Sequence, residues 1–439
     1  MTEAKKPQAK ITSRKNLYKG LFTVEELTIE MDRQDGGTQT VIRENFERGH
    51  AVGILPYDPK TDQVLLVNEM RPGMLAAGDY PFNDCLPAGM IDKGETQVEA
   101  ATRETEEETG QALGNPRMLH EGAFVSAGGT TERLGLVYGT FDSTTAGGIH
   151  GKPGEGENIK SVLLSADEFI ARGKDGRLKD MKSLVLSFWL ALHHDELKDP
   201  DAKSAVAKPV DAKIGDVFAP KKPKLPQAEI VARETLYEGK FKIEDLTIEM
   251  DKHEGGKQTL HRLNFERGNS IAMLGYDAVR DEVVLTSEMR PGMLAAGEYP
   301  YNDSVPAAML GQGEDAIAAA VKQMRRKTGL ELGEPVVIHP GAYVTAGGSS
   351  EKIVLVVGSI DSSTAGGFHG TPGSEDDIKS TVVKSSDFIA RAESGEIKDM
   401  KSLAFAFWLA NNRKALQAKA AAAPKTGKDG LAKKISGLQ

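Results

Sequence analysis

Short apolar runs separated by turn residues recur along the chain and predict β-strands. The segments "AVGILPYD" (51–58) and "QVLLVNEM" (63–70) flank "PKTD", a pattern typical of a β-hairpin. A further strand is predicted at "RLGLVYGTF" (133–141), which follows the glycine-containing turn "SAGGTTE" (126–132). We therefore expect several short strands in this part of the chain.

Two helices are predicted between these strands, at about 96–109 and at about 180–196. The first begins with a capping-box pattern from Thr96 to Glu99, and Gly110 stands where a glycine ends a helix. Strands mixed with few helices favour an α/β or α+β sandwich.

One face of the first predicted helix is weakly apolar and is expected to lie against a sheet. Its residues are Val98, Ala101, Thr102 and Thr105. A different face carries Glu104, Glu107 and Glu108 at a spacing that brings their carboxylates together. Such a cluster is usually a solvated acidic face, here with Arg103 as counter-ion. It is also tolerated when a hard divalent cation lies among the carboxylates.

The chain contains a tandem duplication. The segment "EMRPGMLAAG" at 69–78 recurs letter for letter at 288–297, an offset of 219 residues. The same offset relates the only two tryptophans, Trp189 and Trp408. It also relates the two occurrences of "LTIEMD", of "NFERG" and of "KDMKSL". The repeat spans about 180 residues, which is the size of a domain and far longer than a solenoid unit of ~20–50 residues.

The duplication divides the chain into four parts. We expect a first copy at 11–198 and a second copy at 227–417. Between them, residues 199–226 are rich in Lys, Ala and Pro and predict a semi-extended linker. The basic Lys/Ala tail at 418–439 is expected to be disordered or partly helical.

Composition and charge indicate a cytoplasmic, water-soluble protein. Of the 439 residues, 39% are hydrophobic and 27% are charged, and the net charge is −9, which argues against nucleic acid as a partner. The single cysteine, Cys85, excludes a disulfide framework and fits a reducing compartment. The chain shows no signal peptide and no apolar run of the ~18 residues that a membrane-spanning helix needs, so no membrane partner is expected.

The surroundings of the acidic helix resemble the Nudix hydrolase signature. The matching residues, at the spacing of that signature, are Gly89, Glu95, Arg103, Glu104, Glu107, Glu108 and Gly110. Every glycine, arginine and glutamate position is filled. Thr105 and Gln111 replace aliphatic residues, which loosens packing but removes no metal ligand.

The resemblance extends over nearly the whole first copy and is greatest to the ADP-ribose diphosphatase branch of the Nudix enzymes. It is carried by "NFERGHAVGILPYDPKTDQVLLVNEMRPG", "AGGTTER" and "DSTTAGGIHG". The resemblance implies two tandem α/β/α sandwich domains, each with an N-terminal antiparallel strand extension. One departure is Ala127, because members of this branch often have a proline at that place.

The resemblance also implies a site for Mg²⁺ or Mn²⁺. Its ligands would be the carbonyl of Ala88 and the carboxylates of Glu104, Glu107 and Glu108. Arg103 would pair with Glu95 and hold the preceding loop against the helix. The base that activates water would be a glutamate of the loop "HGKPGEGENIK" (150–160), where we favour Glu157 and retain Glu155 as the alternative. A solvated acidic turn is the other explanation of that loop.

Substrate recognition is implied for four further residues. Arg71 is a candidate phosphate ligand, because a guanidinium can form two hydrogen bonds to phosphate. Glu132 is a candidate contact near the diphosphate, although isolated residues of either type more often form surface ion pairs. If the two copies form an intramolecular pseudo-dimer, Arg262 of the second copy reaches the site of the first. Arg43 then takes the reciprocal place in the second copy.

The second copy has lost the acidic side chains of the signature. At the offset positions stand Ala308 for Gly89, Lys322 for Arg103, Gln323 for Glu104, Arg326 for Glu107 and Lys327 for Glu108. In the loop, Ser374 replaces Glu155 and Asp376 replaces Glu157. Two cations at the ligand positions oppose the binding of Mg²⁺. We therefore expect a catalytically inactive second copy that serves as a scaffold for the first.

These features imply an Mg²⁺-dependent hydrolase that cleaves ADP-ribose to AMP and ribose 5-phosphate. Ala127 leaves another nucleotide sugar, such as GDP-mannose, open as the substrate. A non-catalytic ADP-ribose sensor is the third hypothesis. It predicts damaged metal ligands in both copies, whereas those of the first copy are intact.

Overall fold

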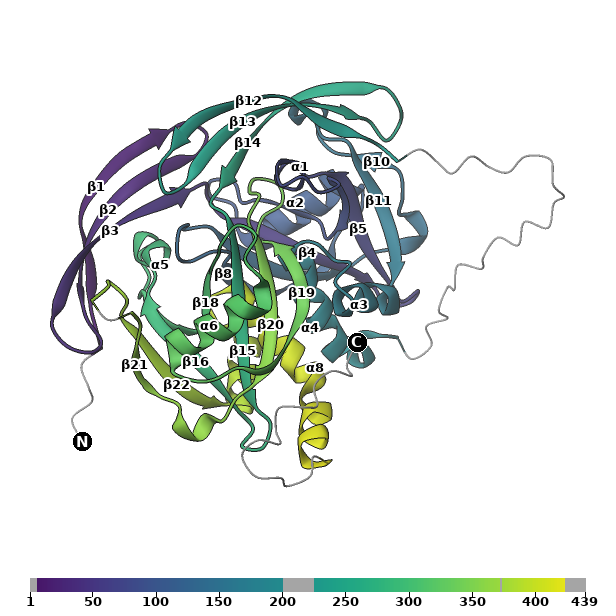
Figure 1. Ribbon diagram of the computed structural model, residues 1–439. Coiled ribbons are helices and arrows are strands. Elements are labelled where there is room, and N and C mark those ends of the chain that lie inside the picture. Colours follow the sequence, from purple (N-terminus) through teal and green to yellow (C-terminus); the bar gives the residue numbers. More distant parts are fainter. Residues whose placement is uncertain (1–5, 200–224, 372, 423–439) are drawn as a thin grey trace.

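The computed structural model describes residues 6–199, 225–371 and 373–422 (Figure 1). The first strand begins at Ala9, two residues before the expected start of the first copy, and the last helix continues to Ala422. Five residues of the expected tail are therefore helical. Residues 423–439 of that tail and 200–224 of the expected linker lie outside the described residues.

The two copies fold into the same series of elements. In the first copy these are β1 (Ala9–Lys19), β2 (Thr23–Asp32), β3 (Thr38–Glu47), β4 (Ala51–Asp58), β5 (Gln63–Met70), α1 (Pro72–Ala76), β6 (Phe82–Cys85), β7 (Ala88–Met90), α2 (Gln97–Thr109), β8 (Gly114–Phe124), β9 (Arg133–Thr140), β10 (Ile149–His150), β11 (Ile159–Ser165), α3 (Ala166–Lys174) and α4 (Met181–Leu197). In the second copy they are β12 (Ala228–Glu238), β13 (Lys242–Asp251), β14 (Lys257–Glu266), β15 (Asn269–Asp277), β16 (Glu282–Met289), α5 (Pro291–Ala295), β17 (Tyr301–Ser304), β18 (Ala307–Leu310), α6 (Ala316–Thr328), β19 (Gly333–Tyr343), β20 (Lys352–Ser359), β21 (Gly367–His369), β22 (Ile378–Lys384), α7 (Ser385–Glu393) and α8 (Met400–Ala422).

Each copy has a mixed sheet of eight strands and a separate antiparallel sheet of three strands. The main path of the first sheet is β10-β11-β5-β4-β9-β8, with β6 on β5 and β7 on β4. The second sheet has the corresponding order, β21-β22-β16-β15-β20-β19. In the first copy β4 and β9 are parallel while the other pairs are antiparallel. The mixed α/β class expected from the sequence is confirmed.

Each three-stranded sheet lies against the other copy (Figure 1). Apolar residues of β2 and β3 pack with Tyr301 of the second copy, and those of β13 pack with Met70 and Phe82 of the first. At a hairpin end, the backbone N–H of Gln34 donates to Asp377 at 2.7 Å. The strand extensions are therefore exchanged between the copies, which brings second-copy residues next to first-copy loops.

The strands and helices expected from the sequence are present. The predicted hairpin corresponds to β4 and β5, although they pair directly over only two residue pairs, Tyr57 with Val64 and Asp58 with Gln63. The capping box of α2 is formed by Thr96 and Glu99. The sequence did not indicate α1 or α3.

The buried face of α2 differs in part from the expected one. Ala101 and Thr105 are buried as predicted, but Val98 and Thr102 are only half-buried. Ala100, Glu108 and Thr109 complete the buried face instead. A carboxylate on the side of the helix that packs against the sheet is the feature that periodicity alone does not anticipate.

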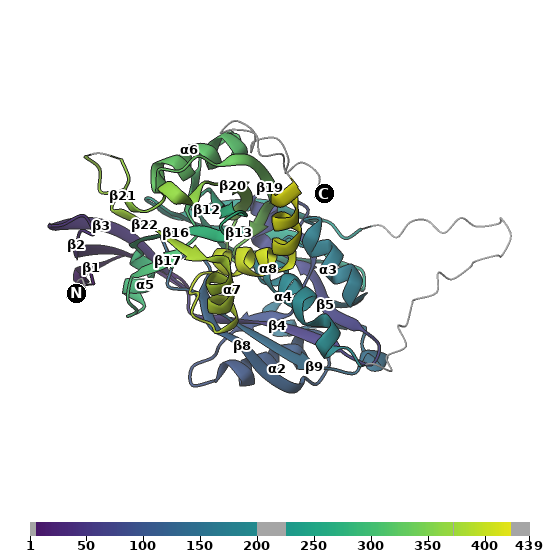
Figure 2. The ribbon, with the colours of Figure 1, turned by 90° about the horizontal axis from the view of Figure 1, so that it is seen from below.

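The core between the copies is formed by α4 and α8, which lie side by side (Figure 2). Most of α4 is buried, and its apolar residues share one hydrophobic core with β4 and β5 of the first copy and with α8 of the second. Backbone hydrogen bonds also join the copies, from Phe124 to Lys398 and from Tyr343 to Lys179, each at 2.8 Å. Among the helices of the described residues, none has the length and apolar content that crossing a membrane requires.

Candidate active site

Helix α2 presents its glutamates to the loop that precedes it. Its N-terminus is fixed by the capping box, and Gly110 ends it in the left-handed conformation with a φ of 69°. Gly89 in β7 faces this helix so closely that a Cβ atom there would collide with the carboxyl group of Glu104. A glycine is therefore required at position 89 as long as position 104 is a glutamate in this orientation.

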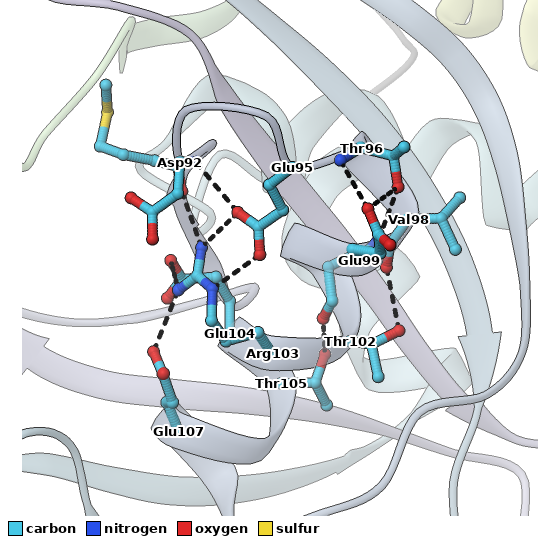
Figure 3. Close-up of polar contacts among 12 residues, drawn as sticks. Asp92, Glu95, Thr96, Val98, Glu99, Thr102, Arg103, Glu104, Thr105 and Glu107 are labelled. Atoms are coloured by element: carbon cyan, nitrogen blue, oxygen red, sulfur yellow. Dashed lines mark hydrogen bonds and ion pairs between the residues drawn. The ribbon is translucent and has the colours of Figure 1, made fainter.

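Arg103 holds the loop and three carboxylates together (Figure 3). Its Nε and Nη2 donate to the two carboxylate oxygens of Glu95, each at 2.8 Å. Its Nη1 donates to Glu104 at 2.7 Å and to Glu107 at 3.1 Å. The hydrogen bonds from Arg103 lower the pKa of Glu95 to about 2. The Arg103–Glu95 pair is the one that the family resemblance implies.

Glu108 is the most deeply buried of the three clustered glutamates. Its carboxylate accepts a hydrogen bond of 3.1 Å from the backbone N–H of Ala88, and only 4% of the residue is exposed. Burial and then the charge of Glu69 raise the pKa of Glu108 well above its ordinary value. The pKa of Glu104 is also raised, primarily by burial. Arg103 and Arg71 offset part of this effect at Glu104 and Glu108, respectively, but burial outweighs them at both carboxylates.

A cavity of about 260 Å³ opens beside these glutamates and is lined by both copies. The candidate residues that the structure brings together there are Arg71, Ala88, Glu104, Glu107, Glu108, Glu132, Glu155, Glu157 and Arg262. Arg103 of α2 contacts Glu104 and Glu107 directly, and Glu95 is linked to them through Arg103. Arg43 lies elsewhere and pairs with Glu375 of the second copy at 2.8 Å.

The loop that carries the candidate bases closes one side of the cavity. Glu157 accepts a hydrogen bond of 2.8 Å from the backbone N–H of Lys152, and its pKa is raised, primarily by burial. Glu155 is more exposed, with 61% of its side chain accessible. The backbone carbonyl of Glu155 accepts a hydrogen bond of 2.7 Å from Arg262. The second copy thus contacts this loop directly.

Arg71 lies at the buried end of the cavity. It is ion-paired with Glu69, and its Nη2 donates to Sγ of Cys85 at 2.8 Å. Glu132 lines another wall, where only 2% of it is exposed and burial raises its pKa. Its nearest cation is Arg48, at 3.9 Å. Of the four predicted substrate residues, Arg71 and Glu132 are therefore buried groups of the cavity.

The chemistry of this cavity fits a divalent metal ion. Glu69, Glu104, Glu107, Glu108 and Glu157 all line it. Carboxylate oxygens are the ligands that Mg²⁺ and Mn²⁺ prefer, and crowded carboxylates with raised pKa values are stabilised by an added cation. Within the described residues, no three acidic, histidine or cysteine side chains already converge on one metal position. Arg103 and the ammonium group of Lys152 occupy oxygens of Glu104 and Glu107 instead.

Comparison with known proteins places the chain in a family. Residues 47–182 match the model of the NUDIX domain. ADP-ribose pyrophosphatase of Escherichia coli (strain K12) is 34% identical over 195 residues, covering 44% of this chain and 93% of that protein. The chain belongs to the NUDIX family.

Other similar proteins are named for different substrates. ADP-ribose pyrophosphatase of Haemophilus influenzae is 33% identical and covers 43% of this chain and 88% of that protein. GDP-mannose pyrophosphatase of Pectobacterium atrosepticum is 32% identical and covers 40% of this chain and 90% of that protein. A solved structure titled as an ADP compounds hydrolase aligns with 44% of this chain and 98% of its own, with 21% identity and a TM-score of 0.34.

The second copy fills the corresponding positions of the NUDIX site with ion pairs. Nζ of Lys327 donates to both carboxylate oxygens of Glu288, at 2.9 and 3.1 Å. Arg290 also pairs with Glu288, at 2.9 Å, and Arg326 pairs with Asp376. Burial raises the pKa of Glu288, but Arg290 and Lys327 outweigh that effect and bring it down to about 2. Burial lowers the pKa of Lys327.

Sequence reasoning missed several residues of the NUDIX cavity. Glu69 and Lys182 both line the cavity. They belong to segments that are identical in the two copies, so comparing the copies gave no reason to single these residues out. Lys152 lies within the loop quoted for its glutamates, where only acidic residues were considered. Residues 344–347 of the second copy also line the cavity. These residues follow β19 and reach the cavity because the copies pack together, with the backbone N–H of Gly73 donating to the carbonyl of Ala346 at 2.9 Å.

Proposed function

We propose that the first copy hydrolyses the diphosphate of ADP-ribose to give AMP and ribose 5-phosphate, with Mg²⁺ or Mn²⁺ as cofactor. The observation that carries this proposal is one cavity that holds the α2 glutamates, Arg71 and Glu157 together. The activities named for the NUDIX relatives support the same class of reaction, hydrolysis of a nucleoside diphosphate sugar.

The substrate's diphosphate would lie between cations and carboxylates of the cavity. Arg71 and Arg262 supply guanidinium groups that can form paired hydrogen bonds to phosphate oxygens. Ala88, Glu104, Glu107 and Glu108 would hold the metal ion. When bound, a divalent cation neutralises charge on the diphosphate and polarises its P–O bonds.

Glu157 would act as the general base. A water oxygen bonds to one phosphorus while the bond from that phosphorus to the bridging oxygen breaks. The water proton passes to Glu157, and the bridging oxygen leaves on the other phosphate. The raised pKa of Glu157 makes it a stronger base than an ordinary carboxylate, which favours proton transfer near neutral pH.

The second copy would be a pseudoenzyme that completes the first copy's site. Met250, Leu260 and Arg262 on β13 and β14 line the cavity, as do residues 344–347. The reciprocal sites are not equivalent, because Lys327 and Arg326 stand where metal ligands would be needed. An intramolecular pseudo-dimer with one catalytic site explains why the second copy keeps its strand extension without its glutamates.

GDP-mannose is the alternative substrate, suggested by the named activity of one group of relatives and by Ala127. Ala127 is buried against Met293 of the second copy and its carbonyl accepts a hydrogen bond of 3.0 Å from Gly292. Ala127 therefore lies in the contact between the two copies.

Product analysis tests the proposal. The full-length protein is mixed with ADP-ribose, or with GDP-mannose in parallel, with and without Mg²⁺. We expect AMP and ribose 5-phosphate from ADP-ribose only when the metal is present. Preferred release of GMP from GDP-mannose would replace the substrate assignment, and binding of ADP-ribose without turnover would favour the sensor.

A further inference from the structure

The loop at 150–158 is attached to helix α2 by Lys152. Nζ of Lys152 forms an ion pair of 2.8 Å with Glu107, and the backbone N–H of Gly151 donates to the carbonyl of Glu107 at 3.0 Å. The ammonium group also lies 3.6 Å from Glu155. A cation of the loop thus occupies a carboxylate that, in the proposed function, belongs to the metal site.

The same residue holds the candidate base. The backbone N–H of Lys152 donates to Glu157 at 2.8 Å, and its carbonyl accepts from the N–H of Glu155 at 3.0 Å. Movement of Lys152 away from α2 therefore displaces the carboxylate of Glu157 as well. The ion pair and the position of Glu157 are mechanically connected through one residue.

The second copy makes the same loop-to-helix connection with the charges exchanged. There the helix supplies the cation, Arg326, and the loop supplies the anion, Asp376. Thr371 takes the place of Lys152, and its N–H donates to Asp376 at 3.1 Å. The connection does not involve a metal-ligand carboxylate on that helix. In the first copy it does, so the first connection alone competes with a metal ion.

We propose that Lys152 is a positioning residue that couples metal binding to the placement of Glu157. Without metal, its ammonium group is the counter-ion of Glu107 and holds loop 150–158 against α2. If Glu107 became a metal ligand, the ammonium group of Lys152 would lose its counter-ion, and loop 150–158 would be free to carry Glu157 toward the substrate. The inference rests on the proposed function, since it takes Glu107 as a metal ligand.

The competition between Lys152 and a metal ion for Glu107 is tested by calorimetry. The binding of Mn²⁺ to the full-length protein is measured in the absence of substrate. Because exposed ion pairs contribute little, Lys152→Met is expected to bind Mn²⁺ about two- to fivefold more tightly than the wild type. The matched control is Lys160→Met, which removes the same charge from a nearby exposed position of β11. We expect it to leave the affinity unchanged.

If Lys152→Met and Lys160→Met bind Mn²⁺ more tightly by the same factor, the change in net charge explains the effect and the proposal is overturned. Unchanged or weaker binding by Lys152→Met would also overturn it, as would a wild type that binds no Mn²⁺. Because no substrate is present, these results do not depend on which nucleotide sugar is cleaved. If Lys152→Met binds Mn²⁺ more tightly as expected but the protein does not hydrolyse ADP-ribose, only the proposed function is contradicted.

Amide hydrogen exchange across residues 150–158 gives a second readout. In the metal-free state, exchange is expected to be faster in Lys152→Met than in the wild type, and Lys152→Arg is expected to restore the slow rate. Mn²⁺ should accelerate exchange of the wild-type loop before substrate is added. A loop whose exchange responds neither to Mn²⁺ nor to Lys152→Met is not held by this ion pair.

Discussion

The two copies place opposite electrostatics on the same backbone. In the first copy, burial and then the charge of the nearby Glu69 raise the pKa of the Glu108 carboxylate. In the second, the corresponding pair is Glu288 and Lys327, whose side chains are joined by two hydrogen bonds. The cavity of the first copy is lined by more carboxylates than cations, whereas the second copy pairs Glu288 with Lys327 and Arg290.

The proposed loss of the second site requires no change of fold, because both copies keep the same order of strands. Buried like charges cost stability unless a ligand compensates them, whereas a buried ion pair avoids that cost but leaves nothing for the ligand to do. Under the proposed function, the first copy carries the functional site and the second copy a structural one. The following predictions test that contrast.

The largest expected effect is on turnover when the candidate base is removed. Glu157→Gln is expected to lower kcat of ADP-ribose hydrolysis by about 10²–10⁴-fold, the usual contribution of general-base catalysis. The matched change in the second copy, Asp376→Asn, should leave kcat unchanged. If Glu155→Gln, and not Glu157→Gln, abolishes turnover, the base has been assigned to the wrong glutamate.

A smaller effect is expected on stability when the buried ion pair of the second copy is broken. Lys327→Gln leaves Glu288 with Arg290 as its remaining partner, and loss of one member of a buried pair costs about 3 kcal/mol. Urea unfolding at pH 7 measures this change. A free energy of unfolding equal to that of the wild type would show that Lys327 contributes nothing to the second copy.

The pH dependence of stability should reveal the same pair. The pKa of Glu288 is about 2 in the folded protein and 4.5 when unperturbed. Its stabilising contribution is therefore present above pH 4.5 and is lost as the pH falls toward 2. Between pH 6 and pH 3 the wild type should lose about 2 kcal/mol more than Glu288→Gln in urea unfolding. Parallel stability curves for the two proteins would contradict the lowered pKa.

The contribution of the second copy to substrate binding should be seen at Arg262. Arg262→Ala is expected to raise KM for ADP-ribose about tenfold, the equivalent of one hydrogen bond to a charged group. Arg43→Ala is the matched control, because Arg43 contacts Glu375 in the second copy and does not line the cavity. Equal effects of the two substitutions would mean that both copies bind substrate.

Local sequence signals predicted much of the fold and of the acidic cluster. The capping pattern from Thr96 and the glycine at position 110 located α2 to within a residue, because both act on the helix ends directly. The spacing of Glu104 from Glu107 placed the two carboxylates on one face of that helix. These inferences needed no tertiary information.

Other features depend on contacts between distant segments and were beyond that reasoning. Helix α2 packs against β4 and β7, and Glu108 accepts a hydrogen bond from Ala88 of β7, which the helix period does not specify. The ion pair of Lys152 with Glu107 requires the loop to fold back on α2. Residues 344–347 reach the first copy's cavity only because the two copies pack together.

The central claim, that only the first copy carries the catalytic site, is tested most directly by one pair of variants at equivalent positions. Hydrolysis of ADP-ribose is measured for full-length Glu108→Gln and Lys327→Gln with saturating Mg²⁺. We predict that Glu108→Gln lowers kcat by about 10³-fold, since metal ions contribute several kcal/mol to such reactions, while Lys327→Gln retains wild-type kcat. Substantial turnover by Glu108→Gln, or its loss in Lys327→Gln, would contradict the assignment of one active and one structural copy.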